Sequence, residues 1–215
     1  MALPIKKLKI IVLIIILASL AFVSCKKDKK DEKSKIPSSE WVSIQGVKWA
    51  IRNVDSPGTF VLKPKDAGMF YQWNRKIGWS SKDPLVNNDG GTTWDDNIPT
   101  GSSWVNANSP CPPGWRLPTK TEFESLVSSG STWTDDYDGV SGRIFRNGDQ
   151  ELFFPAANFR YGGNGSLSSS GYFGYYWSGS YFNSGNASYL SFSSSSANIP
   201  YIVRSAGLSV RCVVE

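Results

Sequence analysis

The 215-residue sequence predicts an α+β domain of short strands, long loops and one or two helices, preceded by an export leader and a flexible tether. Two features predict this fold class: apolar runs with helical spacing are scarce, and short aromatic or β-branched runs alternate with glycine, serine and proline. Nine tryptophans indicate that aromatic side chains fill much of the core. The ~180 residues after the tether suit one domain.

The first 24 residues have the features of a signal peptide. Three lysines precede an uncharged stretch from Ile10 to Val23, in which only Ser19 is polar. These 14 residues are too few for a bilayer-spanning helix, which needs about 20, and fit the apolar part of a signal peptide.

The apolar stretch ends at Ser24-Cys25, which resembles the lipobox of bacterial lipoproteins. The resemblance implies that Cys25 is acylated and anchors the chain to the outer membrane. Phe22 departs from the pattern, which usually has Leu at that position. An ordinary cleaved signal peptide and an uncleaved anchor are the alternatives.

Residues 25–40 are expected to form a flexible tether. Lys26 to Lys35 contains no apolar side chain, so this segment cannot bury surface and stays solvated. It resembles the charged segment that marks lipoproteins for the outer cell surface in gut-type Gram-negative bacteria, which implies surface exposure. The alternative is a plain spacer that faces the periplasm.

The positive net charge of the chain comes from the leader and the tether. Residues 36–215 hold 14 basic and 15 acidic side chains. Binding to a phosphate backbone requires clustered lysines or arginines, and the sequence has no such cluster in this range. Nucleic acid is therefore excluded as a partner.

The cysteines and the missing histidines restrict the chemistry. If Cys25 is acylated, Cys111 and Cys212 remain, and in an oxidising compartment they are expected to pair. Two buried free thiols are the alternative. The chain has no histidine, which excludes a Ser-His-Asp triad and every histidine-based zinc site. Carboxylates remain, but none forms a paired catalytic motif, so we expect no enzyme.

Two segments place oxygen ligands close together, Thr134 to Gly139 and Asn87 to Gly91. Neither has the 12-residue spacing of a specific calcium loop. Aspartate and asparagine beside glycine are more often turn residues. We therefore predict turns, no metal site and no cofactor.

The N-terminal half of the domain contains three predicted strands and one long loop. Trp41 to Ile44 and Val47 to Ile51 are expected to pair around a turn at Gln45-Gly46, and Met69 to Trp73 is a third strand. Ser80 to Asn108 is rich in Gly, Asn, Asp and Ser and is expected to be a loop, with Trp94 and Trp104 attaching it to the core. A loop of this length is often functional.

The clearest local signal is a helix start after Pro118. Thr119 is a predicted N-cap, and Glu122 follows three residues later to complete a capping box. Phe123, Leu126 and Val127 give one apolar face, so the helix should span Lys120 to Ser128. The predicted strands after it are Arg143 to Phe145, Leu152 to Phe154, Tyr175 to Ser178, Ser188 to Phe192 and Leu208 to Val213.

Several segments together resemble a known family. They read GVKWAIRNV, FYQWN, CPPGWRLPTKTEFESL, LFFPAA, YYWSGS and GLSVRCV. The set is similar to the Fibrobacter succinogenes major paralogous domain of bacterial surface lipoproteins, and residues 41–215 would form that domain.

The resemblance implies a C-type-lectin-like fold with short antiparallel strands, related to that of formylglycine-generating enzymes. In such a fold the first and last strands pair, which would set Val47 to Ile51 beside Ser209 to Val213. The chain lacks the Glu-Pro-Asn, Gln-Pro-Asp and Trp-Asn-Asp triplets of calcium-dependent sugar-binding lectins. Its two remaining cysteines lie in segments with structural features, so formylglycine-type catalysis is not expected.

The candidate recognition surface lies in the C-terminal third. Residues 156–204 hold seven tyrosines, thirteen serines, seven glycines and five asparagines, and residues 152–214 contain no acid. Antibody loops use the same residue types, because tyrosine gives broad contact at low entropic cost while Ser, Gly and Asn adapt. The alternative is a serine-rich region that only solvates strands. The expected ligand contacts are Tyr161, Phe173, Tyr175, Tyr181, Phe182, Asn183, Asn186, Tyr189 and Tyr201.

The same region resembles the variable proteins of diversity-generating retroelements, in which adenine-directed mutagenesis changes Asn codons. That resemblance implies a template copy of the coding region in the flanking DNA. The positions expected to vary are Tyr161, Ser168, Phe173, Tyr175, Phe182, Asn183, Asn186, Tyr189, Tyr201, Ile202 and Val203.

The sequence as a whole favours a surface lipoprotein that binds an extracellular glycan or protein. The alternative from another class is a structural subunit of a surface assembly, such as a pilus tip.

Overall fold

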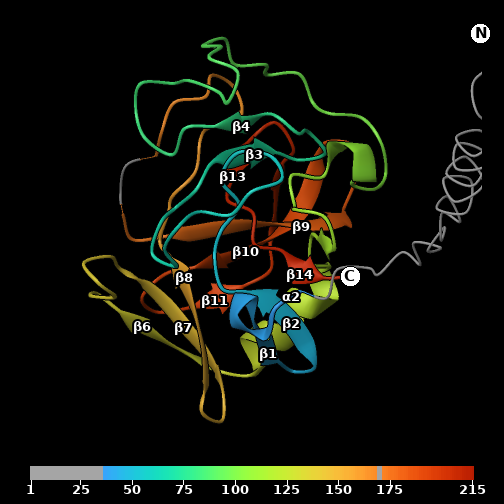
Figure 1. Cartoon of the computed structure of the whole chain (residues 1–215). Helices are drawn as coiled ribbons and strands as arrows, with labels where there is room; N and C mark the ends of the chain where they lie inside the picture. Colours follow the sequence, from blue (N-terminus) through green and yellow to red (C-terminus); the bar gives the residue numbers. More distant parts are fainter. Residues whose placement is uncertain (1–35, 169–170) are drawn as a thin grey trace, which may run out of the picture. The chain divides into compact units, whose positions relative to one another are not determined.

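The structure is a computed structural model that describes residues 36–168 and 171–215 (Figure 1). The predicted signal peptide, Cys25 and the charged run Lys26 to Lys35 lie outside the described residues. Within the described ranges, no helix has the length and apolar character needed to span a membrane.

The described residues form an α+β fold of short, mostly antiparallel strands with a single α-helix, as predicted. The helical elements are η1 (Ser38–Glu40), η2 (Asn106–Asn108) and α2 (Lys120–Ser128). The strands are β1 (Trp41–Ile44), β2 (Val47–Ala50), β3 (Phe70–Gln72), β4 (Gly78–Trp79), β5 (Trp115–Arg116), β6 (Ser131–Thr134), β7 (Gly142–Asn147), β8 (Gln150–Pro155), β9 (Gly174–Tyr181), β10 (Asn186–Phe192), β11 (Ala197–Asn198), β12 (Tyr201–Val203), β13 (Gly207–Leu208) and β14 (Val213–Val214).

The strands of the described chain form four small sheets, ordered β1-β2-β14-β5, β13-β3-β4, β6-β7-β8 and β9-β10 with β11 and β12 on the far edge of β10. In Figure 1, β9 and β10 lie between β3, β4 and β13 on one side and β1, β2 and α2 on the other. Two core clusters of buried side chains fill the space on the two faces of the β9–β10 pair.

The β1–β2 hairpin forms as predicted. Gln45 and Gly46 have φ of 51° and 77°, the left-handed values that a tight two-residue hairpin turn requires. The resulting register pairs Ile44 with Val47 and Val42 with Trp49. Trp49 is fully buried, and its ring centroid lies 5.2 Å from that of Phe123 on α2.

Helix α2 has the predicted bounds and the predicted capping box. The Thr119 hydroxyl accepts a hydrogen bond from the Glu122 backbone N–H, and the Glu122 carboxylate accepts one from the Thr119 N–H at 2.7 Å. The same carboxylate accepts bonds of 2.9 and 2.6 Å from Arg116. Phe123 and Leu126 are fully buried on the face that packs into the core.

The predicted strand Leu208 to Val213 is wrong, because the chain there changes partner. Leu208 pairs with Tyr71 of β3, whereas Val213 pairs with Trp49 of β2 and Arg116 of β5. The four residues between them do not belong to a strand, so this segment contains two short strands, β13 and β14, in different sheets.

The expected placement of Val47 to Ile51 beside the last strand is confirmed, although the strand that pairs with β14 is β2 and not the first strand, β1. Val213 lies opposite Trp49, and the Ala50 backbone N–H donates to the Cys212 carbonyl at 2.9 Å. This places the C-terminal strand between β2 and β5.

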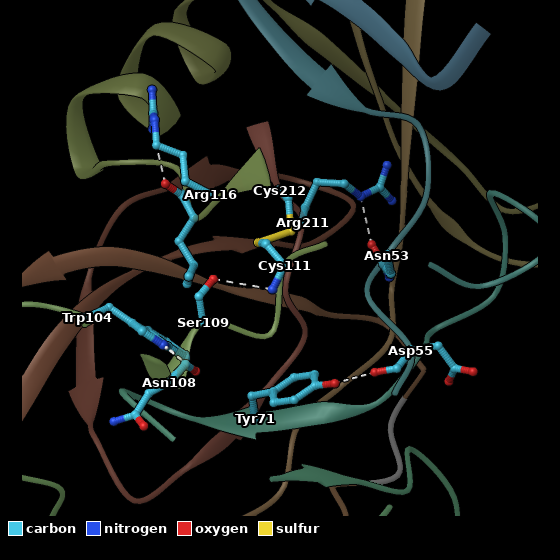
Figure 2. Close-up of a disulfide and its surroundings, with 11 residues drawn as sticks. Asn53, Asp55, Tyr71, Trp104, Asn108, Ser109, Cys111, Arg116, Arg211 and Cys212 are labelled. Atoms are coloured by element: carbon cyan, nitrogen blue, oxygen red, sulfur yellow. Dashed lines mark hydrogen bonds between the residues drawn. A yellow bond between two sulfur atoms is a disulfide. The ribbon is translucent and has the colours of Figure 1, made fainter. Parts of the chain in front are cut away.

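Cys111 and Cys212 form a disulfide across a sequence separation of 101 residues, with Cα atoms 6.1 Å apart. Figure 2 shows the bond beside Arg211, whose Nε donates to the Asn53 amide oxygen at 2.8 Å. The loop-entropy model gives such a bridge about 4.7 kcal/mol of stabilisation of the folded state.

The compact domain begins earlier than the predicted boundary at residue 41. Ile36 packs against the first core cluster, and Glu40 forms an ion pair with Arg52. The predicted tether therefore does not extend to residue 40, since residues 36–40 already contact the fold.

Substitution Glu122→Gln tests the capping network. Burial alone would raise the pKa of the Glu122 carboxyl, but the hydrogen bonds from Arg116 and Thr119 and the arginine charge lower it overall. A depressed folded-state pKa stabilises the fold above the unfolded value and loses that effect as the pH falls. We expect Glu122→Gln to reduce the free energy of unfolding by about 1 kcal/mol at neutral pH. The difference from the parent should shrink as the pH falls below the pKa of an unfolded glutamate.

The matched control is Glu124→Gln, because Glu124 forms only an exposed pair with Lys120 four residues earlier. Such a pair contributes about 0.3 kcal/mol. Urea unfolding of the three proteins at neutral and acid pH measures both effects. Equal losses from the two substitutions would contradict the role of the capping network.

Candidate recognition surface

The structure divides the nine expected contact residues into two groups. Four of them belong to an aromatic cluster on one face of the β9–β10 pair. The other five lie at the end of the β9–β10 hairpin and on the neighbouring strand β12.

The first group, with one further residue, forms a connected set of rings that we call the aromatic face. Its members are Phe159, Tyr161, Phe173, Tyr175 and Tyr189. Ring centroids are separated by 4.8 Å from Tyr161 to Phe159, 4.8 Å from Phe159 to Tyr175, 6.1 Å from Phe173 to Tyr175 and 5.7 Å from Tyr175 to Tyr189. These separations are typical of interacting aromatic pairs.

Strand alternation explains why these rings share a face. In the β9–β10 register, Trp177 lies opposite Tyr189 and Tyr176 lies opposite Leu190. Neighbouring residues of a strand point to opposite faces, so Trp177 and Tyr189 enter the first core cluster while Tyr176 and Leu190 enter the second. Tyr175 joins the face of Trp177 and Tyr189.

Exposure falls along the aromatic face from its rim to the core. Tyr161 is 50% exposed and Phe173 is 39% exposed, whereas Tyr189 is 8% exposed. Tyr189, one of the expected contact residues, is therefore largely covered in this structure. Its ring is covered because it lies between Tyr175 and Trp177, with centroids 5.7 and 6.2 Å away.

The phenols of the buried end stay neutral at physiological pH. Burial raises the pKa of Tyr175 and of Tyr189, and the neighbouring phenols Tyr161 and Tyr175 add to these shifts. The aromatic face can therefore offer neutral hydroxyl groups as hydrogen-bond donors and acceptors.

At the hairpin end, two exposed rings stack on each other. Phe182 and Tyr201 have centroids 3.9 Å apart and an interplanar angle of 8°, and they are 48% and 57% exposed. β12 pairs with β10 in a register that sets Ser188 opposite Tyr201, which brings this ring beside the hairpin turn.

The two expected asparagine contacts hold the hairpin turn together. The Asn183 amide oxygen accepts hydrogen bonds from the Gly185 N–H at 2.9 Å, the Asn186 N–H at 2.8 Å and the Asn186 side-chain amide at 3.2 Å. These bonds occupy the Asn183 oxygen, so its role in this structure is to close the turn.

Tyr181 lines a groove that the sequence did not predict. The groove has a volume of about 480 Å³ and lies between residues 98–102 of the long loop and the β9–β10 turn, with Arg204 among its lining residues. Trp104, on the same loop, contacts Trp73 with centroids 5.8 Å apart, as expected for its attachment to the core. Trp94 also attaches the loop, since its Nε1 donates to the Gly162 carbonyl at 2.9 Å.

Arg204 is buried to 2% exposure beneath this groove. It donates to the Gly101 carbonyl at 2.7 Å and to the Ser184 carbonyl at 2.5 Å. Its guanidinium carbon lies 4.8 Å from the Trp73 ring centroid and 5.5 Å from that of Tyr181. Burial lowers the pKa of Arg204, but an arginine remains charged in proteins.

Two contributors to this surface could have been found from the sequence. Phe159 precedes Tyr161 with the two-residue spacing of a strand face. Arg204 is a cation in a stretch without any acid, and such a side chain must find other partners when it is buried.

The acidic segments form turns, as predicted. The Asn87 amide oxygen accepts hydrogen bonds from the backbone N–H groups of Asp89 and Gly91 at 2.9 and 2.8 Å. The Asp136 carboxylate accepts one from the Gly139 N–H at 2.7 Å. These oxygens are engaged in turn geometry.

In comparisons with known proteins, no family model, no curated protein and no solved structure matches the chain.

Substitution at Asn183 separates a turn role from a contact role. Asn183→Ala should reduce the free energy of unfolding by about 1 kcal/mol, because the Gly185 N–H loses its acceptor and the Asn186 N–H keeps only a longer bond to the Asn183 carbonyl. Asn183→Asp keeps the acceptor oxygen and should stay close to the parent. Thermal and urea unfolding of both variants check this expectation. Equal stability of the alanine variant and the parent would show that the turn does not depend on the side chain.

Proposed function

We propose that this chain is a surface-anchored lipoprotein whose domain binds an extracellular glycan or protein through the aromatic face. In this proposal Cys25 is acylated, the charged run holds the domain away from the outer membrane, and residues 36–215 are a C-type-lectin-like domain of the Fibrobacter succinogenes major paralogous type. The pairing of β2 with the last strand, β14, agrees with the strand contact expected for that fold.

The observation that carries the proposal is the connected and supported arrangement of the aromatic face. Tyr161 and Phe173 present large apolar surfaces to solvent, which is costly unless a partner covers them. Each contacts rings that reach the core through Tyr175 and Tyr189. A contact surface that is already rigid loses little conformational entropy when a ligand binds.

The chemistry of this face suits a neutral, hydroxyl-rich or aromatic partner. Ring faces can cover the apolar side of a sugar ring or a side chain, and tyrosine hydroxyls can bond to polar groups at the edge. The acid-free stretch from 152 to 214 adds serine and asparagine as adaptable hydrogen-bonding groups.

Binding is proposed in place of catalysis because the residues suited to acid–base work are missing from this region. The chain has no histidine, and residues 152–214 contain no carboxylate side chain. General acid–base catalysis most often uses histidine, and carboxylates are the next common choice.

Retroelement diversification is proposed for the exposed positions only. Tyr161, Phe173, Phe182 and Tyr201 are at least 39% exposed and can change without cost to the core. Tyr189 is buried, so variation there would disturb packing. A template repeat in the flanking DNA with Asn codons at the exposed positions tests this point, and its absence would contradict it.

A glycan and protein array with residues 36–215 tests the binding function, since this range contains both core clusters and the disulfide. The double variant Tyr161→Ala with Phe173→Ala should lose at least about tenfold in affinity, because aromatic anchors dominate such interfaces. The matched control is Tyr137→Ala, which removes a ring stacked on Phe153 elsewhere, at 3.9 Å between centroids.

Binding by the parent and the control but not by the double variant, with all three folded by circular dichroism, is the expected result. No binding by the parent, or equal binding by all three, would contradict the proposal. That outcome would favour the alternative role as a structural subunit of a surface assembly.

The anchor is tested by Cys25→Ser in cells supplied with a clickable fatty acid. We expect the parent and a Ser24→Ala control to carry the label and to fractionate with the outer membrane. Cys25→Ser should lose both properties, because serine lacks the thiol to which the lipid would be attached. Labelling that survives Cys25→Ser would contradict lipidation at this residue.

A further inference from the structure

The groove beside Tyr181 differs in charge from the aromatic face. Its lining residues are Ile98, Pro99, Thr100, Gly101, Ser102, Tyr181, Ser184, Gly185 and Arg204. Arg204 is the only charged residue in this set. The groove therefore combines one buried cation with hydroxyl groups and an apolar wall.

The positive charge of Arg204 is not neutralised by a carboxylate in the hydrogen bonds of its guanidinium. Both bonded partners are backbone carbonyls, those of Gly101 and Ser184. Its Nε is buried and has no hydrogen-bond partner in the described structure. Buried charges are normally paired with an opposite charge. The bonded neighbours of Arg204 are carbonyls and its ring neighbours are aromatic, so its charge favours the binding of an anion in the groove.

The other two arginines of the acid-free stretch differ from Arg204 in their surroundings: Arg160 has a carboxylate partner, and Arg211 is enclosed in the core. Arg160 is fully buried and has a carboxylate partner, Asp83, at 3.3 Å. Arg211 is fully buried and donates to the Asn53 amide and to the Ala50 carbonyl within the core. Neither of them is among the residues that line the groove.

The remaining lining residues suit a sugar ring. The Tyr181 ring is 41% exposed and the Ile98 side chain is 48% exposed, so both offer apolar surface to one face of a ring. Thr100, Ser102 and Ser184 offer hydroxyl groups to its edge. A volume of about 480 Å³ lies within the range of small-molecule sites.

We propose that this groove binds an acidic sugar, with the carboxylate of a uronic-acid-type ring directed toward Arg204 and the ring lying against Tyr181. The inference deepens the proposed function, on which it rests, by naming the ligand class of one site. The carboxylate would face the low-dielectric floor of the groove, where the attraction between opposite charges is stronger than in water.

The test uses tetragalacturonate and its full methyl ester, which share the same sugar chain but differ in the charge of the ring substituent, since each carboxylate of the acid is a neutral methyl ester in the second compound. Both are titrated into ¹⁵N-labelled protein of residues 36–215, with backbone and arginine Nε–H signals observed by NMR. We expect the acid to shift the signals of Tyr181, Ser184, Gly185 and the Arg204 Nε–H. The ester should bind at least about tenfold more weakly.

Two variants at one exposed position sharpen the test. Ser184→Asp places a negative charge at the rim of the groove, while the Ser184 carbonyl that Arg204 uses is unchanged. We expect it to weaken tetragalacturonate binding by about tenfold or more and to leave the ester unchanged. Ser184→Asn is the uncharged control and should bind as the parent does.

Several outcomes would overturn the inference: no binding of tetragalacturonate at millimolar concentrations, equal binding of acid and ester, or shifts confined to residues outside the groove. Binding of acetate alone with the same shifts would overturn the role of the ring. The double variant of Tyr161 and Phe173 should still bind tetragalacturonate, since neither residue lines the groove. The array result with that variant therefore decides the proposed function separately.

Discussion

The C-terminal segment from Arg204 to Val214 is the constraint on which the rest of the structure depends. Almost every residue in it bonds to a different part of the chain: Leu208 pairs with β3, Ser209 exchanges backbone hydrogen bonds with β9, and the Val210 carbonyl accepts from Val54. Arg211 then bonds to Asn53, Cys212 forms the disulfide and Val213 pairs with β2 and β5. A segment with so many partners makes the positions of the sheets that it joins depend on one another.

The same segment positions both parts of the recognition surface. Ser209 holds β9 through the Trp177 N–H at 3.0 Å and the Tyr175 carbonyl at 3.1 Å, which fixes the strand that carries the aromatic face. At its other end, the Arg204 backbone N–H donates to the Gly185 carbonyl at 2.9 Å, and its side chain bonds to the long loop. The segment that connects the sheets therefore also holds the recognition surface in position. A site that is held by the packed elements of the fold is rigid before a ligand binds.

Buried cations without carboxylate partners are a second feature of this region. Burial lowers the pKa of Arg211 to about 10 and raises that of the adjacent Tyr176 to about 12. At neutral pH the arginine stays charged and the phenol stays neutral, and the surrounding amide and carbonyl dipoles replace the missing acid. A buried charge satisfied in this way is specific to one backbone arrangement, because the carbonyls must point at it from several segments. Arg204 is also bonded to carbonyls, but it lies beneath an open groove, where the anion of the proposed ligand can pair with its charge.

The sequence by itself determined the local elements and the charge of the domain. Helix α2 follows from Thr119, Glu122 and the apolar face after them, and the first hairpin follows from Gln45-Gly46, because both depend on residues close together in the chain. Only the tertiary structure decided that residues 208–213 divide into two strands, that Tyr189 is covered while Tyr161 is open, and that the Asn183 amide closes a turn. It alone brought residues 98–102 to Arg204 across a separation of about a hundred residues. These outcomes depend on which distant segments come into contact in the folded chain. Local sequence patterns describe only neighbouring residues, so they do not predict such contacts.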